Sequence, residues 1–472
     1  MMQSLSVRLT IAILLVVVVR LISLGAYPLM DTTEARYGEM ARIMVDTGNW
    51  LTPQFDYGVP FWGKPPMQTW VSAFSGNLFS INEFFLRLPH LISGLLTLAI
   101  VGYVAKRKGI SPYLSILTLL TTVGFYIASG ALMTDSLLAL AMTISMVGFY
   151  FAWEGHDKNS AYLGFAGIGF GLLIKGPVII VLIGIAVVPW IITNYGLLEG
   201  FRQFWRRIPI FSGLALALII SAPWYLLAEQ ATPGFLDYFI IGEHWSRFTV
   251  SGWEGDLYGS AHDEIKGTIW WYWLYTAFPW SLFAVYLLVN QSKRKQMFKD
   301  KVNRRWNSFL LFWVISPMVL FTFAGNILQM YVLPGIPALA LFIVSGMQTF
   351  RRLEYLLCSI TPIAVLALIT AASPLLYEKS DTALFENIDK SMPVYYEGKP
   401  TFSGRYYTSG KALNLNDHKD ELVPPYYVVV SKSRMVATNK NISGCNYVSE
   451  NRKRILVECL GISISSESST SF

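Results

Sequence analysis

Apolar runs of 18 or more residues recur from the N-terminus of this 472-residue chain to about residue 377. Each run is long enough to cross a hydrocarbon core of about 30 Å as a helix. Helices are required because lipid cannot satisfy free backbone N–H and C=O groups. Only 14% of the residues are charged, whereas soluble chains have about 25%. The sequence therefore predicts a mainly α-helical, polytopic membrane protein.

About eleven membrane spans are predicted, with ends defined to within several residues. They are 7–27, 84–105, 112–129, 134–153, 160–174, 177–194, 209–228, 268–290, 307–324, 329–348 and 354–376.

Lys and Arg are unequally distributed between alternate loops. They gather at 106–108, 202–207, 293–305 and 351–352, whereas the loop from about 229 to 266 is acidic. Cytoplasmic loops carry the excess of Lys and Arg. We therefore expect a cytoplasmic N-terminus, with the first loop and the chain after residue 377 on the opposite side. The net charge of +7 follows from this topology and requires no nucleic-acid partner.

The chain divides into two predicted domains. Residues 1–376 form the membrane domain, whose first external loop covers 28–83. Residues 377–472 are more polar and contain short strand-like runs, which predicts a small extracytoplasmic α/β domain. An oxidising compartment would allow Cys445 and Cys459 to pair in this domain, and two reduced thiols remain the alternative.

The first external loop is predicted to contain two helices. Apolar residues at helical spacing follow Asp31 and Thr32, either of which could be the N-cap, and Gly48 would end the helix. A second helix follows the segment "KPP" at 64–66. Both look amphipathic and suited to the headgroup layer.

Ionisable side chains from several loops are predicted at one depth. Each of these side chains could have a purely structural role. Asp31 and Asp135 could cap helices, Lys175 could snorkel, and Arg247 could bind lipid headgroups. Ionisable groups near hydrocarbon are costly and usually functional, so a shared cavity is expected. It would hold carboxylates beside cations, which suits transfer of a group from a lipid phosphate. The charged candidates are Asp31, Glu34, Arg36, Lys64, Asp135, Lys175, Glu243, His244 and Arg247.

The segment "MDTTEARYGEMARIMVDTGNWLTPQFDYGVPFWGKPPMQTWVSAF" at 30–74 resembles the first external loop of ArnT-like glycosyltransferases, the lipid A aminoarabinose transferases and their relatives. Further similar segments follow in order, including "MTDSLLA" (133–139), "LIKGP" (173–177), "GEHWSRF" (242–248) and "YVLPGIPALAL" (331–341). The resemblance implies the GT-C fold, the bacterial inner membrane, and a donor sugar linked to undecaprenyl phosphate. It also implies a periplasmic C-terminal domain that caps the cavity.

The resemblance also implies roles for individual residues. Asp31 would be the catalytic carboxylate, Lys64 would hold the donor phosphate, and Asp135, Lys175 and Arg247 would line the same site. From their charge we further expect Arg247 and Lys175 to bind the donor phosphate. The residues that would position substrate are Glu34, Arg36, Tyr37, Asp135, Glu243 and His244.

Two segments depart from the family pattern. Gly63 precedes "KPP" where the family commonly has a Glu associated with a bound metal, so we predict no metal and no cofactor. Asn326 and Gln329 precede "YVLP" where the family often has lysines. A cation is thus missing where the family would bind an anionic acceptor.

The predicted activity is inverting transfer of a hexose or pentose to a lipid A-like, glycan or other envelope acceptor. A protein O-glycosyltransferase of the same fold, acting on Ser or Thr, is one alternative. A transporter of lipid-linked sugars is another, although transporters usually show internal repeats that this chain lacks.

Overall fold

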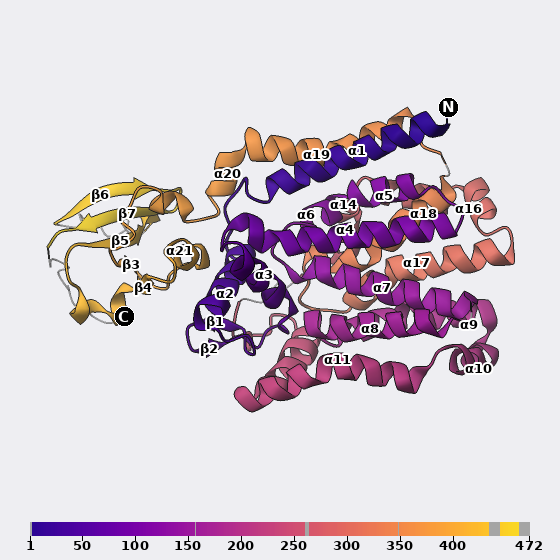
Figure 1. Ribbon diagram of the computed structural model, residues 1–472, viewed down its shortest axis with the longest axis horizontal. Coiled ribbons are helices and arrows are strands. Elements are labelled where there is room, and N and C mark those ends of the chain that lie inside the picture. Colours follow the sequence, from indigo (N-terminus) through magenta and orange to yellow (C-terminus); the bar gives the residue numbers. More distant parts are fainter. Residues whose placement is uncertain (1, 156, 260–263, 348, 434–443, 462–472) are drawn as a thin grey trace.

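Long helices run side by side in one bundle, and a small β-sheet domain lies at one end of it (Figure 1). The computed structural model describes residues 2–155, 157–259, 264–347, 349–433 and 444–461. The chain begins at the end of the bundle that lies away from the β-sheet domain (Figure 1). Helices α1 and α19 lie together along one side.

The bundle contains helices of very different length. They are α1 (Met2–Ser23), α4 (Glu83–Arg107), α5 (Pro112–Leu120), α6 (Val123–Ala128), α7 (Thr134–Gly155), α8 (Lys158–Lys175), α9 (Val178–Tyr195), α11 (Ile210–Ala231), α14 (Thr268–Thr276), α15 (Trp280–Val289), α17 (Lys301–Phe321), η2 (Gln329–Gly335), α18 (Ile336–Gly346) and α19 (Arg352–Thr370). Shorter connecting helices are α10 (Leu197–Arg207), α12 (Phe235–Asp237), η1 (Tyr238–Ser246), α13 (Arg247–Thr249), α16 (Gln291–Met297) and α20 (Ser373–Tyr377).

The described residues contain seven helices that are long and apolar enough to cross a membrane, or eight if the bent pair α14 and α15 is one span. The chain is therefore an integral membrane protein. The expectation of about eleven spans also counted segments 112–129, 160–174 and 307–324. The first of these is broken into α5 and α6. The other two correspond to α8 and α17, which begin with lysines and lie within the bundle (Figure 1).

The first external loop folds as two helices joined by a small hairpin. Helix α2 (Thr33–Thr47) ends at Gly48, whose φ of +67° is the left-handed conformation that favours glycine. Strands β1 (Gln54–Asp56) and β2 (Val59–Pro60) follow, and then helix α3 (Met67–Leu78). Both predicted helices are confirmed. These elements lie between the bundle and the β-sheet domain (Figure 1).

The C-terminal domain is a five-stranded mixed sheet of order β4-β3-β5-β7-β6. Strand β3 pairs in parallel with β4 and β5, while β7 pairs antiparallel with β5 and β6. A disulfide between Cys445 and Cys459 joins β6 to β7. Parts of the predicted domain, 434–443 and 462–472, lie outside the described residues. Its elements are η3 (Thr382–Phe385), β3 (Val394–Tyr396), α21 (Phe402–Tyr407), β4 (Ala412–Asn414), η4 (Leu415–Asp417), η5 (Lys419–Glu421), β5 (Tyr426–Ser431), β6 (Cys445–Glu450) and β7 (Arg454–Cys459).

Residues alternate between the two faces of this sheet. Along β5, Tyr427 and Val429 pack on one face, while Tyr426, Val428 and Val430 pack on the other. This alternation is the period of two expected of a strand. Both faces of the sheet are therefore packed, and Tyr407 of α21 packs on the face that carries Tyr427 and Val429.

Candidate active site

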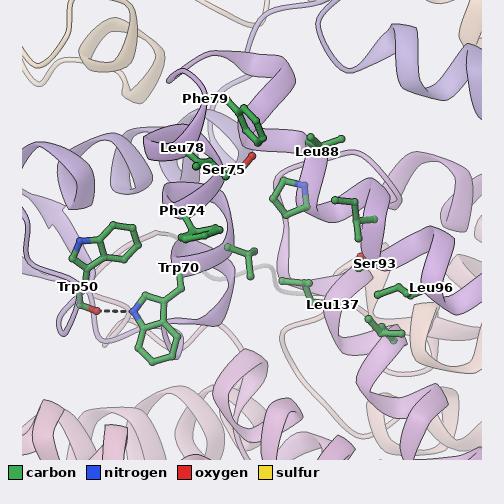
Figure 2. A pocket seen from close by; sticks show the side chains of 14 residues that line it. Trp50, Trp70, Phe74, Ser75, Leu78, Phe79, Leu88, Ser93, Leu96 and Leu137 are labelled. Carbon is green, nitrogen blue, oxygen red and sulfur yellow. Dashed lines mark hydrogen bonds between the residues drawn. The ribbon is translucent and has the colours of Figure 1, made fainter.

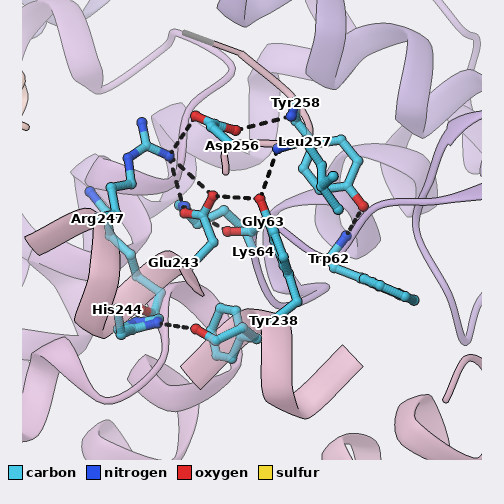
Figure 3. A network of polar contacts seen from close by, with 12 residues as sticks. Trp62, Gly63, Lys64, Tyr238, Glu243, His244, Arg247, Asp256, Leu257 and Tyr258 are labelled. Carbon is cyan, nitrogen blue, oxygen red and sulfur yellow. Dashed lines mark hydrogen bonds and ion pairs between the residues drawn. The ribbon is translucent and has the colours of Figure 1, made fainter. Parts of the chain in front are cut away.

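Glu243 holds two cations from different parts of the chain (Figure 3). Lys64, just before α3, places Nζ 2.9 Å from Glu243 Oε2. Arg247, one turn further along, places Nη1 3.1 Å from both carboxylate oxygens. Burial raises the pKa of Glu243, but the charges of Lys64 and Arg247 outweigh burial, so the pKa is lowered. Glu243 is therefore a buried anion that keeps two cations together.

Two further groups complete this network (Figure 3). Asp256 places Oδ2 3.2 Å from Arg247 Nη1. The Tyr238 hydroxyl lies 3.4 Å from Glu243 Oε1 and accepts a hydrogen bond from the Leu257 N–H at 3.1 Å. The loop segment that carries Asp256 and Leu257 is thus fixed against η1.

A second ion pair joins α8 to α7. Lys175 Nζ lies 2.8 Å from Asp135 Oδ1, with both side chains largely buried, and 4.3 Å from the centre of the Tyr331 ring. Gly176 follows with φ of +73°, and a Cβ there would lie 2.6 Å from Phe239. The turn therefore requires glycine, and η1 packs closely against it.

His244 faces the same turn. Its Nδ1 lies 2.8 Å from the Phe239 carbonyl oxygen, and its Nε2 lies 3.3 Å from the carbonyl oxygen of Lys175. Burial lowers the pKa of His244. The ring is therefore neutral near pH 7, and its single N–H can donate to only one of the two carbonyls.

These groups meet at a cavity of about 370 Å³. Its lining combines three cations, two of them anchored by Glu243, with apolar side chains such as Val178 and Phe321. Such a cavity can receive a phosphate that carries a hydrocarbon chain. Its lining residues are Lys64, Lys175, Pro177, Val178, Val181, Glu243, His244, Trp245, Arg247, Phe248, Leu320, Phe321, Asn326 and Tyr331.

A larger groove of about 570 Å³ lies between α3, α4 and α7 (Figure 2). Side chains such as Trp70, Phe74 and Leu137 line it, and none of its lining residues is charged. The Trp70 indole N–H donates to the Trp50 carbonyl at 2.6 Å. This groove shares no lining residue with the charged cavity, so it is not the place where a phosphate would be held.

Three predicted site residues lie on α2 and are not among the residues that line the cavity, although Tyr37 interacts electrostatically with Lys175, Asp135 and Glu243. Glu34 pairs with the wholly buried Arg87, with Nη2 to Oε2 at 2.9 Å. Arg36 donates from Nη1 to the Tyr258 carbonyl at 2.9 Å and lies over the Tyr37 ring. The Tyr37 side chain is buried, which raises its pKa. The predicted substrate-positioning roles of Glu34, Arg36 and Tyr37 remain predictions.

Asp31 faces the C-terminal domain. Its Oδ1 accepts a hydrogen bond from the Ser403 N–H at 3.0 Å, and its Oδ2 accepts one from the Ser403 hydroxyl. Burial raises the pKa of Asp31 to about 6, although the hydrogen bonds from Ser403 lower it. Asp31 is not among the residues that line the cavity. Its predicted catalytic role stays a prediction.

Sequence reasoning missed Asp256, Tyr258, Tyr331 and Ser403. Tyr331 begins the segment "YVLPGIP", and Asp256 stands in the acidic loop, so both had a signal. Tyr258 and Ser403 had none, because only their long-range contacts distinguish them from other Tyr and Ser residues.

The surroundings of Gly63 leave no room for the Glu that the family associates with a bound metal. A Cβ at this position would lie 2.9 Å from Phe61 and 3.3 Å from Tyr258, two rings that pack on each other. A carboxylate side chain would have to displace them. Over the described part of the chain, no three His, Cys, Asp or Glu side chains are placed to hold a metal ion.

A family model described as dolichyl-phosphate-mannose-protein mannosyltransferase matches residues 4–239, half of the chain. The chain belongs to this family. Curated relatives include the undecaprenyl phosphate-alpha-4-amino-4-deoxy-L-arabinose arabinosyl transferases of Shewanella sediminis and Edwardsiella ictaluri. The first is 30% identical over 344 residues, 69% of this chain and 57% of the relative. The second is 27% identical over 336 residues, 68% of this chain and 56% of the relative. The match thus spans less than two thirds of either relative.

Solved structures of a similar fold cover nearly the whole chain. The crystal structure of ArnT from Cupriavidus metallidurans bound to undecaprenyl phosphate superposes with a TM-score of 0.76 at 19% identity, over 97% of this chain and 98% of that one. The crystal structure of the same protein in the apo state superposes with a TM-score of 0.73 at 18% identity, over 96% of this chain and 98% of that one. This member of the mannosyltransferase family therefore has the ArnT-like GT-C fold.

Proposed function

We propose that the chain is an inverting glycosyltransferase that moves a sugar from a polyprenyl phosphate to an acceptor. The observation that carries the proposal is the convergence of Lys64 and Arg247 on one buried carboxylate, in a cavity that is also lined by apolar side chains. Cations beside apolar side chains fit a lipid-linked phosphate. The donor named in the relatives and in the ArnT complex, undecaprenyl phosphate, has this chemistry.

In the proposed reaction an acceptor oxygen attacks the anomeric carbon, and the bond from that carbon to the phosphate oxygen breaks. The electron pair leaves with the polyprenyl phosphate, whose negative charge grows. Lys64 and Arg247 stabilise that charge, so no general acid is needed at the leaving group. Lys175 adds a third cation at the cavity.

A hydroxyl acceptor must also lose a proton. The resemblance assigns this step to Asp31, whereas Glu243 and Asp135 are the carboxylates whose partners line the cavity. A positioned general base contributes about 10²–10⁴-fold. If Asp31 accepts this proton, Asp31→Asn abolishes transfer.

The acceptor class has two candidates. The aminoarabinose transferase relatives favour a lipid A-like or other envelope glycolipid. The protein mannosyltransferase family model, together with neutral Asn326 at the cavity, favours a Ser or Thr hydroxyl of a protein.

We also propose that the C-terminal domain is periplasmic in a bacterial inner membrane. The N-terminus and helices α10 and α16 share one end of the bundle, opposite this domain (Figure 1). Helices α10 and α16 are rich in Lys and Arg, as cytoplasmic segments are.

The test uses the full chain in proteoliposomes with purified undecaprenyl-phosphate sugars, a 4-amino-4-deoxyarabinose and a hexose. Glycolipid and Ser/Thr-peptide acceptors are offered separately, and mass spectrometry follows free undecaprenyl phosphate. Release that requires an acceptor supports the proposal. Movement of intact donor across the bilayer, without cleavage, would instead support a transporter.

A further inference from the structure

The C-terminal domain holds the beginning of the first external loop. Ser403 donates to both carboxylate oxygens of Asp31, 372 positions earlier in the chain. The Asp31 N–H donates to the Lys379 carbonyl at 2.8 Å. Backbone and side chain of Asp31 are therefore both attached to the same domain.

Ser403 is itself fixed by the sheet. Its hydroxyl oxygen accepts a hydrogen bond from the Asp381 N–H at 3.0 Å. The buried Asp381 carboxylate accepts hydrogen bonds from Arg454 at 2.8 Å, Asn451 at 2.8 Å and Tyr396 at 2.9 Å. The group that binds Asp31 thus belongs to the rigid part of the domain.

Two other residues of α21 hold the loop. The Tyr407 hydroxyl accepts a hydrogen bond from the Leu29 N–H at 2.8 Å and donates to Glu83 at 2.6 Å. Arg405 Nη1 lies 2.7 Å from Asp56 Oδ2 on β1. Helix α21 therefore contacts the first external loop at three places. These are the segment before α2, the hairpin, and the start of α4.

Packed rings continue from this contact to the cavity. The Phe402 ring lies 5.1 Å from Phe55, which lies 5.1 Å from Tyr258. The Tyr258 hydroxyl accepts a hydrogen bond from the Trp62 N–H at 3.0 Å, two residues before Lys64. A continuous set of contacts therefore links α21 to the segment that carries Lys64.

We propose that the C-terminal domain is the positioning element of this site, and that Asp31, held by Ser403, is a positioning residue that keeps the first external loop in the geometry that places Lys64. The kinetic consequence rests on the proposed function. The structural consequence does not.

Hydrogen exchange on the full chain in nanodiscs tests the structural consequence. The variants are Asp31→Ala and Ser403→Ala, with Ser391→Ala as control, because Ser391 bonds to Asp389 within its own turn. The reporters are the amides of Phe61 and Trp62, whose acceptors are the Pro53 carbonyl and the Tyr258 hydroxyl. We expect amide exchange at 54–64 to be faster than in the wild-type chain in both variants. In the control it should equal that of the wild type. Unchanged exchange in both would overturn the proposal.

Kinetics separate positioning from proton transfer. In the positioning role, Asp31→Ala and Ser403→Ala lower kcat/KM for the donor by about 10- to 100-fold, and Asp31→Asn, which keeps an acceptor oxygen, restores most of it. If Asp31 accepts the proton, Asp31→Asn is as inactive as Asp31→Ala while Ser403→Ala stays active, and the positioning role is wrong. A wild-type chain without transferase activity would refute the proposed function, and the exchange result would still stand.

Discussion

Lys64 and Glu243 are 179 residues apart in the chain, yet Lys64 Nζ lies 2.9 Å from Glu243 Oε2. The pair joins the first external loop to η1 and holds one cation of the cavity at a fixed place. A donor phosphate that binds here would bring a second anion to the same cation. Glu243 therefore prepares the site for an anion and also competes with it.

Lys64→Ala should raise the donor KM by about 10- to 100-fold, because hydrogen bonds to charged groups contribute about 1.5–3 kcal/mol. Lys106→Ala, an exposed change in the last turn of α4, serves as the control. Initial rates over a range of donor concentration measure the effect. A donor KM and kcat equal to those of the control would remove Lys64 from the phosphate site.

Asp135→Asn should destabilise the membrane domain by about 3–5 kcal/mol, because it leaves Lys175 buried without its carboxylate. Thermal unfolding followed by size-exclusion fluorescence measures this. The double variant Asp135→Asn with Lys175→Met should recover stability, since no unpaired charge remains, but not transfer. An equally unstable double variant would show that packing, rather than charge, causes the loss.

Docking of the first loop on α21 should weaken as the pH rises. Burial raises the Asp31 pKa from 3.8 to about 6, so the folded state binds this proton more tightly than the unfolded state. The resulting stability is fully present below pH 4 and is lost as the pH rises through 6, by up to about 3 kcal/mol. Hydrogen exchange at 54–64 should therefore be slower at pH 5 than at pH 8, relative to the Asp31→Asn variant. An identical pH dependence in that variant would contradict the prediction.

Gly63→Glu should not create a metal site. Its Cβ would lie 2.9 Å from Phe61, which is packed against Tyr258, and such overpacking costs about 1–3 kcal/mol. The expected result is a lower Tm with no stoichiometric metal in elemental analysis. A stable variant that copurifies with one equivalent of metal would show that only the missing carboxylate prevents binding.

Hydropathy predicted the helical class but not the number of uninterrupted helices. Segment 268–290 looks like one apolar span, whereas α14 and α15 are bent by 112° at a break that contains Pro279. Proline lacks an N–H and clashes with the preceding turn, so it can break a helix that hydropathy reads as continuous.

Charge clustering predicted much of the site. Lys64, Lys175, Glu243, His244 and Arg247 do line one cavity. The direction of Asp31 could not be predicted, because it depends on Ser403, and a single sequence carries no signal for a contact across 372 positions. The ion pair between Glu34 and Arg87 could not be predicted for the same reason.

The contact between Asp31 and Ser403 also sets an order of events during synthesis. The first helix and the loop after it leave the ribosome long before α21 exists. If the proposed positioning role holds, Lys64 lacks the support that α21 gives through Phe55 and Tyr258 until the C-terminal domain has folded. A chain truncated ahead of α21 would still carry every charged residue of the cavity, and on this proposal it would lack the contacts that place Lys64.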